Sequence, residues 1–431
     1  MSRNMNQDLN YYHLIHQEIA SLVLYQSIFD DEVGQAFLEV FDLISVRNKE
    51  LIDIKCLKAY GHWLRNLAFQ GISWQDYLIK KILMDDNPFS QQVQQVSLED
   101  LPKPLIEATE HDLSILKSLY KLPLEAISQW VKEAANLPFS PFVGQCENKN
   151  NTFLHQQDNW ENCLDPLAQH YRQHGTGIFA QYKALKWYNN QLIGITEADP
   201  ITLTEIVGYE SQKETLIKNT EILLSGYNAL NVLLYGSRGS GKSSLVKGLL
   251  NEYYSQGLRL VEVNKSQLSD LPMIVDQLRY IPQKFIIFVD DLSFEEDNDA
   301  FKSLKVVLEG NVTAKAKNVV VYATSNRRHL IREYFDDRPR PKDADEIHHW
   351  DTVQEKLSFS DRFGLTLTFE PANQDTYLNI VHHLASQIEL KMDKNELGFR
   401  AKQWATQHNG RSGRTARQFI DFLEGELKLN K

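Results

Sequence analysis

The octet Gly236-Ser-Arg-Gly-Ser-Gly-Lys242-Ser243 directly follows the apolar run Val232-Leu-Leu-Tyr235. Its three glycines allow a tight backbone turn that aims several N–H groups at one point, and a helix beginning near Lys242 adds the positive end of its dipole. A strand, a turn of this kind and a helix together form a nest for a phosphate group. The octet therefore predicts a bound nucleoside triphosphate.

The residues of this loop have separate expected roles. Lys242 is expected to reach the β and γ oxygens of the triphosphate as a point charge, and the Ser243 hydroxyl is expected to be a ligand of Mg²⁺. The residues predicted to bind the nucleotide through this loop are Gly236, Ser237, Arg238, Gly239, Ser240, Gly241, Lys242, Ser243 and Ser244.

Two carboxylates follow another apolar run. Phe285-Ile-Ile-Phe-Val indicates a buried strand that delivers Asp290 and Asp291 to the carboxyl edge of a parallel sheet, where ligands bind in such folds. Asp290 is the expected water-mediated Mg²⁺ partner. Asp291 is placed to orient or deprotonate the attacking water. Because its side chain is shorter than that of Glu, Glu295 or Glu296 from the following turn is the alternative.

A neutral amide follows a further predicted strand. The run Val319 to Ala323 is succeeded by Thr-Ser-Asn326, which places Asn326 at the same sheet edge. An amide there can hold the attacking water without a competing charge. Asn after a strand is commonly a turn residue, but in combination with the two preceding strand ends the pattern predicts Asn326 beside the γ-phosphate.

Size and composition narrow the class of protein. The chain of 431 residues has room for two or three domains, and its net charge of −11 argues against a general attraction to polyanions. The segment from Arg327 to Asp351 mixes basic with acidic residues, which favours a solvated loop over a reader of phosphate backbones. No apolar stretch approaches the length of a membrane span and the first residues lack an apolar signal region, so we expect a cytoplasmic protein. Reduced, structural thiols are expected at Cys56, Cys146 and Cys163.

The pattern of apolar residues divides the chain into four parts. Residues 1–145 predict an all-helical N-terminal region, and residues 146–199 predict a loop and helical linker, with a helix over 166–188. Residues 200–371 alternate strands with helices, which predicts an α/β domain with a mainly parallel sheet of about five strands. Residues 372–431 are expected to form a small helical C-terminal lid. The expected strands are Val232 to Tyr235, Leu260 to Val263, Phe285 to Val289, Val319 to Ala323 and Leu365 to Phe369.

Together these residues resemble the AAA+ class of P-loop ATPases. The Walker A lysine, Walker B aspartate, sensor-one asparagine, arginine finger and sensor-two arginine of that class have candidates in the same order: Lys242, Asp290, Asn326, Arg362 and Arg414. The segment Ile206-Val207-Gly208-Tyr209 resembles the one that wraps adenine in that class, so Val207 and Gly208 join the expected ATP-binding residues. The resemblance implies ATP and Mg²⁺ as ligands and an AAA+-type sheet flanked by helices.

More narrowly, five segments look like the bacterial ATP-binding family known as domain of unknown function family 815. They are Asp290-Asp291-Leu-Ser-Phe-Glu295, Leu304-Lys-Val-Val-Leu-Glu-Gly310, Tyr322-Ala-Thr-Ser-Asn-Arg-Arg-His-Leu330, Ser360-Asp-Arg-Phe-Gly364 and Arg411-Ser-Gly-Arg-Thr-Ala-Arg417. The resemblance covers roughly residues 170 to 428. In that family the second carboxylate is also Asp, so Asp291 departs only from the wider class. The resemblance implies no biological role, because the family is largely uncharacterised.

The resemblance also gives roles to arginines. Arg362 would be a finger presented to the nucleotide of a neighbouring subunit, which implies a ring-like homo-oligomer. The alternative is a surface arginine paired with a carboxylate. Arg414 would contact the γ-phosphate from the lid of its own subunit, although Arg411 and Arg417 compete for this role. The residues thus expected to be catalytic are Asp291, Asn326, Arg362 and Arg414, and those expected to bind the metal are Ser243 and Asp290.

Several functions compete at this stage. The first is an ATPase that hydrolyses ATP to drive conformational change on an unidentified macromolecular client, such as a protein. The second is a slowly hydrolysing switch or scaffold whose N-terminal helices dock a partner. The third is a nucleic-acid remodelling or loader ATPase, against which the acidic charge argues mildly. A P-loop kinase fits less well with the Asn-ended strand and the helical lid. Protein threading is not expected, because Asn264-Lys-Ser-Gln-Leu-Ser-Asp270 has no aromatic residue where a threading loop would carry one.

Overall fold

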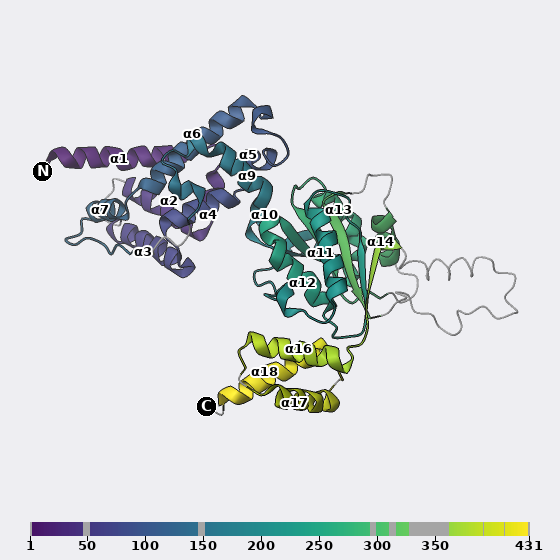
Figure 1. Cartoon of the computed structure of the whole chain (residues 1–431). Coiled ribbons are helices and arrows are strands. Elements are labelled where there is room, and N and C mark those ends of the chain that lie inside the picture. Colours follow the sequence, from purple (N-terminus) through teal and green to yellow (C-terminus); the bar gives the residue numbers. More distant parts are fainter. Residues whose placement is uncertain are drawn as a thin grey trace. The chain divides into compact units, whose positions relative to one another are not determined.

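The computed structural model describes residues 2–45, 52–144, 151–293, 299–309, 316–326, 362–390, 392–408 and 410–429, and Figure 1 shows its helices and strands. The chain divides into two compact units, Met1–Gln181 and Tyr182–Lys431. This division falls inside the stretch 146–199, which was expected to be a linker. Within the described ranges, no helix combines the length and the apolar character needed to cross a bilayer.

The first unit is helical, as predicted for the N-terminal region. Its α-helices in the described ranges are α1 (Ser2–Ala20), α2 (Glu32–Ser45), α3 (Ile52–Gln70), α4 (Trp74–Met84), α5 (Pro88–Gln92), α6 (Lys103–Lys121), α7 (Leu124–Ala134), α8 (Phe153–Gln156), α9 (Leu164–His174) and α10 (Gly177–Gln181). The apolar positions of α2 recur at helical spacing and face one core. There the Phe37 ring stacks on Trp74, with 4.1 Å between ring centroids, and lies 5.3 Å from Trp63.

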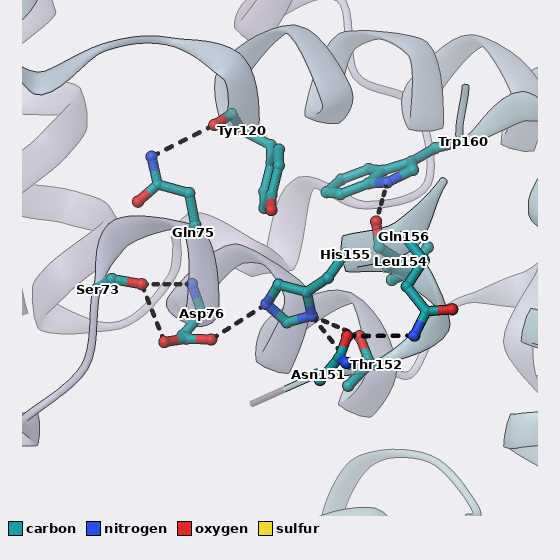
Figure 2. Close-up of polar contacts among 10 residues, drawn as sticks. All are labelled: Ser73, Gln75, Asp76, Tyr120, Asn151, Thr152, Leu154, His155, Gln156 and Trp160. Carbon is teal, nitrogen blue, oxygen red and sulfur yellow. Dashed lines mark hydrogen bonds and ion pairs between the residues drawn. The ribbon is translucent and has the colours of Figure 1, made fainter. Parts of the chain in front are cut away.

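A buried polar cluster ties the segment after residue 150 to α4 (Figure 2). Asp76 is 4% exposed; its carboxylate lies 3.2 Å from His155 Nε2 and accepts a hydrogen bond from the Ser73 hydroxyl at 3.0 Å. His155 Nδ1 accepts the backbone N–H of Thr152 at 3.0 Å, so the proton of the neutral ring lies on Nε2 and faces Asp76. In a hydrolase triad the imidazole contacts the serine hydroxyl. Here both His155 and Ser73 contact the carboxylate, so the cluster stabilises the packing of this segment and does not form such a triad.

We expect His155→Ala to lower the free energy of unfolding of the first unit by about 1–3 kcal/mol, because the buried Asp76 carboxylate loses its imidazole partner. Urea unfolding followed by tryptophan fluorescence measures this change. His16→Ala is the matched control, since His16 Nε2 lies 3.0 Å from Asp42 at the surface, with side chains 29% and 67% exposed. Loss of that exposed pair should change stability by less than about 1 kcal/mol. Equal effects of the two substitutions would contradict a special role for the buried cluster.

The second unit is a sheet covered by helices and followed by a helical lid. Its sheet and the helices beside it are β1 (Ala184–Tyr188), β2 (Gln191–Gly194), α11 (Glu210–Leu224), β3 (Val232–Gly236), α12 (Lys242–Tyr253), β4 (Leu258–Glu262), α13 (Leu271–Leu278), β5 (Lys284–Val289), α14 (Asp299–Glu309), β6 (Val319–Ser325) and β7 (Leu365–Phe369). The lid helices, drawn in yellow-green to yellow in Figure 1, are α16 (Gln374–Gln387), α17 (Lys394–Gln407) and α18 (Gly413–Leu429). The lid has its own apolar core, which includes Tyr377, Ala401 and Phe419.

The order of the strands places the candidate site. The seven-stranded sheet runs β2-β1-β4-β5-β6-β3-β7. The hairpin of β1 and β2 is antiparallel, and the other neighbouring strands are parallel. Because β7 lies on one side of β3 while β6, β5 and β4 lie on the other, the loop after β3 opens where the strand order reverses, which is where ligands bind in open α/β sheets. The five expected strands are all present as β3 to β7, and the predicted α/β fold, with a mainly parallel sheet and a helical C-terminal part, is confirmed.

The two strands before residue 200 correct the sequence analysis. The helix predicted over 166–188 is wrong beyond Gln181, because Ala184–Tyr188 forms β1 and pairs with β4. The sheet therefore has seven strands where about five were expected. Residues of this predicted helix instead alternate across a strand: Trp187 is buried and donates its indole N–H to Asp270 Oδ2 at 2.9 Å, whereas Lys186 and Tyr188 are exposed. A run of five residues is too short for its period to distinguish strand from helix.

Some sequence predictions concern residues outside the described ranges. Cys56 and Cys163 are buried, whereas Cys146 lies outside the described residues. So do Glu295 and Glu296, the alternatives to Asp291, and the mixed-charge segment from Arg327 to Asp351.

Candidate nucleotide site

The glycine-rich loop begins at a close approach between two strands. Gly236, the last residue of β3, has φ +140°, and a Cβ added there would lie 2.0 Å from the carbonyl oxygen of Phe369 at the end of β7. The next residue, Ser237, donates its N–H to the same carbonyl at 3.0 Å. Only glycine fits at this position, because a side chain would push the two strands apart. The first glycine of the octet therefore serves to join the loop to the sheet.

The other two glycines shape the loop itself. Gly239 and Gly241 have φ +75° and +87°, the left-handed conformation that favours glycine. Gly241 is the N-cap of α12, so the helix starts at Lys242, as the sequence predicts. The turn thus directs the first backbone N–H groups and the positive dipole end of a twelve-residue helix toward the space above the sheet.

The side chain of Lys242 lies against the loop. Its Nζ donates to the carbonyl oxygens of Gly236 at 3.0 Å and Ser237 at 2.7 Å. The residue is 6% exposed. Burial lowers the pKa of Lys242, and the negative charges of Asp290 and Asp291 oppose that effect. A partly desolvated ammonium interacts more strongly with an anion than one in water does.

The Asp290 carboxylate connects three elements at the carboxyl edge of the sheet. Its Oδ1 accepts hydrogen bonds from the Ser243 hydroxyl on α12 at 2.7 Å and from the Thr324 hydroxyl on β6 at 2.5 Å. The backbone N–H of Asp291 donates to the same oxygen at 3.2 Å. The structure therefore brings together Ser243 and Asp290, the two residues predicted from the sequence to bind a metal, and adds Thr324 beside them.

Asp291 and Asn326 also come together. Asp291 has φ +50°, an uncommon conformation for a residue other than glycine, of a kind found at functional sites. Its backbone N–H donates to Thr324 Oγ1 at 2.9 Å, and its side-chain Oδ1 accepts a hydrogen bond from Asn326 Nδ2 at 2.8 Å. The carboxylate and the amide predicted to act on one water thus lie within hydrogen-bonding distance of each other.

The lid contributes arginines from the first turns of α18. The backbone N–H of Arg414 donates to the carbonyl oxygen of Gly239 at 3.2 Å, which places the start of α18 on the loop. Arg417 Nη2 lies 2.5 Å from Glu205 Oε2, on the segment that precedes α11. Arg411 donates instead to a side-chain amide of α16. Among the three competing arginines, Arg414 and Arg417 therefore face the candidate site.

These groups enclose one cavity of about 550 Å³. Its walls are formed by Ile201, Glu205, Ile206, Val207, Arg238, Gly239, Ser240, Gly241, Lys242, Ser243, Ser244, Asp290, Asp291, Thr324, Asn326, Ile380, Leu384, Gly413, Arg414, Arg417 and Gln418. Its polar lining includes the loop, the two aspartates and Asn326. Its apolar lining consists of Ile201, Ile206 and Val207 and, from the lid, Ile380 and Leu384. A volume of this size is typical of small-ligand sites.

Some of the predicted residues lie behind the cavity wall. Gly236 and Ser237 support the loop from the sheet. Gly208 has φ +93° and packs against α16, where an added Cβ would lie 2.7 Å from Thr376 Cγ2. Its neighbour Val207 reaches the cavity. Gly208 therefore shapes the segment that carries Val207, and the sequence analysis did not distinguish these two contributions.

Arg362 lies away from this cavity. It precedes β7 and forms an ion pair with Glu309, the last residue of α14. Its side chain is 19% exposed and that of Glu309 is 44% exposed. Pairing with a carboxylate was the alternative considered for Arg362, and the structure contains such a pair. A residue that acts on the nucleotide of a neighbouring subunit does not need to reach its own cavity.

Thr324 and Glu205 line the cavity but were not among the predicted site residues. Thr324 carried a usable signal, because it stands two residues before Asn326 and alternate strand residues share one face. Glu205 carried none, since its pairing with Arg417 joins residues far apart in the sequence. Burial favours a higher pKa for Glu205, but hydrogen bonds from the Thr202 N–H and from Arg417 outweigh it and lower the pKa overall.

Comparison with known proteins gives a family match for the second unit. The family model described as protein of unknown function (DUF815) matches residues 180–427, more than half of the chain. No curated protein matches the chain. Among solved structures, it is similar to Thermotoga maritima RuvB, described as a Holliday junction branch migration motor, with 14% identity over 52% of this chain and 72% of that chain and a TM-score of 0.32. A variant of the same protein gives 15% identity over the same shares of both chains and a TM-score of 0.34.

We expect Gly236→Ala to destabilise the second unit by about 2 kcal/mol or more, because the new methyl group would collide with a backbone carbonyl at the junction of β3 and β7. Chemical unfolding without nucleotide measures this effect separately from ligand binding. Gly425→Ala on α18 is the control, since no atom lies within 4 Å of a Cβ added there and alanine favours the helix by up to about 1 kcal/mol. Unchanged stability of the Gly236 variant would show that the close approach of the two strands is not required.

Proposed function

The chain belongs to the DUF815 family, and we propose that it is an AAA+-type ATPase that binds ATP with Mg²⁺ and hydrolyses it to drive conformational change in a macromolecular client. The observation that carries this proposal is the convergence of Lys242, Ser243, Asp290, Asp291 and Asn326 on one cavity above the loop after β3. These residues come from the ends of two separate strands, β5 and β6, and from the start of α12. Their chemistry is that required to hold a triphosphate, a hard cation and a water molecule.

The cavity fits the two halves of an adenosine triphosphate. The left-handed glycines and the start of α12 direct N–H groups at a phosphate, and Lys242 and Arg414 add positive charge. The cavity is also lined by the apolar side chains of Ile206, Val207, Ile380 and Leu384, which suit packing against a flat base. A ligand of the size of a nucleotide can contact both the polar and the apolar residues that line the cavity.

The donor set also fits a magnesium ion. The Ser243 hydroxyl and the Asp290 carboxylate are hard oxygen donors held 2.7 Å apart, and Mg²⁺ prefers such ligands together with water and phosphate oxygens. When bound, Mg²⁺ would neutralise part of the charge on the phosphates. The role of this chain is to fix the two oxygens before the ion arrives, through the additional hydrogen bonds that Asp290 accepts.

Asp291 and Asn326 are proposed to act on the attacking water. Asp291 would accept a proton from it, and Asn326 would position it and the Asp291 carboxylate together through the hydrogen bond that its amide donates. The same hydrogen bond favours a second candidate function, a slowly hydrolysing switch, because the Asp291 oxygen that Asn326 occupies must be released before it can accept a proton from water. The rate of ATP turnover separates the two functions.

We expect Lys242→Ala to lower ATP affinity by about 100-fold or more, because the buried ammonium is lost from the loop. Asp291→Asn should bind ATP within about threefold of the unchanged protein and lose at least about 100-fold in turnover, because the proton acceptor is replaced by an isosteric amide. A fluorescent ATP analogue measures binding and phosphate release measures turnover. Retained affinity in the Lys242 variant would remove the basis of the proposal. Unchanged turnover in the Asp291 variant would transfer the role of base to another residue.

Arg362 is proposed to act on the nucleotide of a neighbouring copy of the chain in a ring-like homo-oligomer. For this it must exchange Glu309 for phosphate oxygens, which a guanidinium can bind with two parallel hydrogen bonds. Fingers of this kind in related NTPases contribute roughly a thousandfold or more to turnover.

We expect Arg362→Ala to keep ATP binding and to lower turnover at least about 100-fold, and turnover per subunit of the unchanged protein to rise with protein concentration. Mixing the Arg362 and Lys242 variants should restore activity above that of either alone, because one variant supplies the loop and the other the arginine. Lys302→Ala is the control, since it lies on α14 outside the cavity. Absence of restored activity, together with concentration-independent turnover, would contradict action between subunits.

A further inference from the structure

One threonine forms hydrogen bonds with both aspartates of the candidate site, with the carboxylate of one and the backbone of the other. The register of the parallel strands β5 and β6 pairs Val289 with Ala323. The residues that follow them, Asp290 and Thr324, are therefore neighbours at the sheet edge. Thr324 is 2% exposed. Its hydroxyl donates to Asp290 Oδ1 at 2.5 Å and accepts the backbone N–H of Asp291 at 2.9 Å.

The bonding capacity of a hydroxyl makes this pair of contacts specific. Thr324 has one O–H to donate and lone pairs to accept with, and the structure uses both kinds of bond on consecutive residues. Its backbone takes part as well, because the Leu292 N–H donates to the Thr324 carbonyl oxygen at 2.7 Å. The turn that carries Asp290 and Asp291 is therefore bound to β6 through the side chain and the backbone of one residue, Thr324.

The next outward residue on the same face of β6 completes the arrangement. Thr324 and Asn326 are two residues apart, so their side chains point to the same side of the strand. Thr324 fixes the backbone of Asp291 in its left-handed conformation, and Asn326 binds the carboxylate at the tip of the same residue. The hydroxyl and the amide thus hold Asp291 at two points.

We propose that Thr324 is a positioning residue for the ATPase reaction, whose hydroxyl orients Asp290 toward the Ser243 hydroxyl and sets the backbone from which Asp291 reaches the water. This inference rests on the proposed function. It assigns Thr324 no contact with ATP. Loss of the Thr324 hydroxyl should therefore alter the Mg²⁺ dependence and the rate of turnover and leave the affinity of the loop for the nucleotide unchanged.

Thr324→Val tests the hydroxyl, because valine has nearly the same shape and can neither donate nor accept. In this variant we expect turnover at saturating Mg²⁺ to fall by about 10- to 100-fold and the Mg²⁺ concentration for half-maximal turnover to rise by about tenfold. Nucleotide affinity in EDTA should stay within about twofold, because the loop and Lys242 are unchanged. Thr324→Ser keeps the hydroxyl and should restore both quantities to within about threefold of the unchanged protein.

Two results would overturn the proposal: a valine variant with unchanged turnover and Mg²⁺ dependence, or a serine variant as impaired as the valine variant while both melt at the temperature of the unchanged protein. If the valine variant fails to fold, Thr324→Cys takes its place, since a thiol fills the site but is a weak donor and acceptor. Failure of the proposed function would show differently, as a lack of nucleotide binding by the unchanged protein. If that protein binds ATP without turnover, the Mg²⁺ dependence of its binding provides the same comparison.

Discussion

One carboxylate oxygen, Oδ1 of Asp290, holds together the parts of the second unit that form the candidate site. It joins the start of α12, the end of β5 and the edge of β6 through the hydroxyls of Ser243 and Thr324 and one backbone N–H. An acceptor on which three donors converge has little freedom to rotate, so the positions of loop and strands are fixed relative to one another. The buried Thr324 hydroxyl donates its hydrogen bond to this charged group, so it is not left unsatisfied at the edge of the apolar core.

The glycine-rich loop is constrained from two further directions. From below, the absence of a side chain at Gly236 lets the end of β3 approach the Phe369 carbonyl, and from above the start of α18 binds the carbonyl oxygen of Gly239. The lid is also tied to the segment before α11, through Arg417 to Glu205 and through His383 Nε2, which lies 2.6 Å from the carbonyl oxygen of Thr204. Because loop and lid share these contacts, a change at the loop is mechanically connected to α16 and α18.

The sequence predicted those parts of the site that depend on neighbouring residues and missed those that depend on contacts between distant segments. The loop, Asp290 and Asn326 were placed correctly at the sheet edge because each follows an apolar run, and parallel strands bring their carboxyl ends to one edge. Strand β1 was missed because its residues become a strand only by pairing with β4, a contact that local spacing does not reveal. The spacing of Thr324 from Asn326 was a local signal that went unused, but its contacts with Asp290 and Asp291 depend on the register between β5 and β6. The roles of the individual site residues stay predictions.

The roles of the arginines also depend on contacts between segments that are far apart in the sequence. Arg411, Arg414 and Arg417 are equivalent in sequence terms, and only the docking of α18 on the loop separates the two that face the cavity from the one that faces α16. For Arg362 the sequence supports only an analogy with its class of proteins, and the structure adds a partner, Glu309, on α14.

The partner of Arg362 bears on how the proposed action between subunits could be controlled. The ion pair with Glu309 is partly exposed to solvent, and such pairs stabilise a fold by about 1 kcal/mol or less. A guanidinium that forks onto phosphate oxygens in a dehydrated interface gains more than that. In the proposed ring, exchanging Glu309 for the phosphate oxygens of a neighbour's nucleotide would therefore be favourable for Arg362.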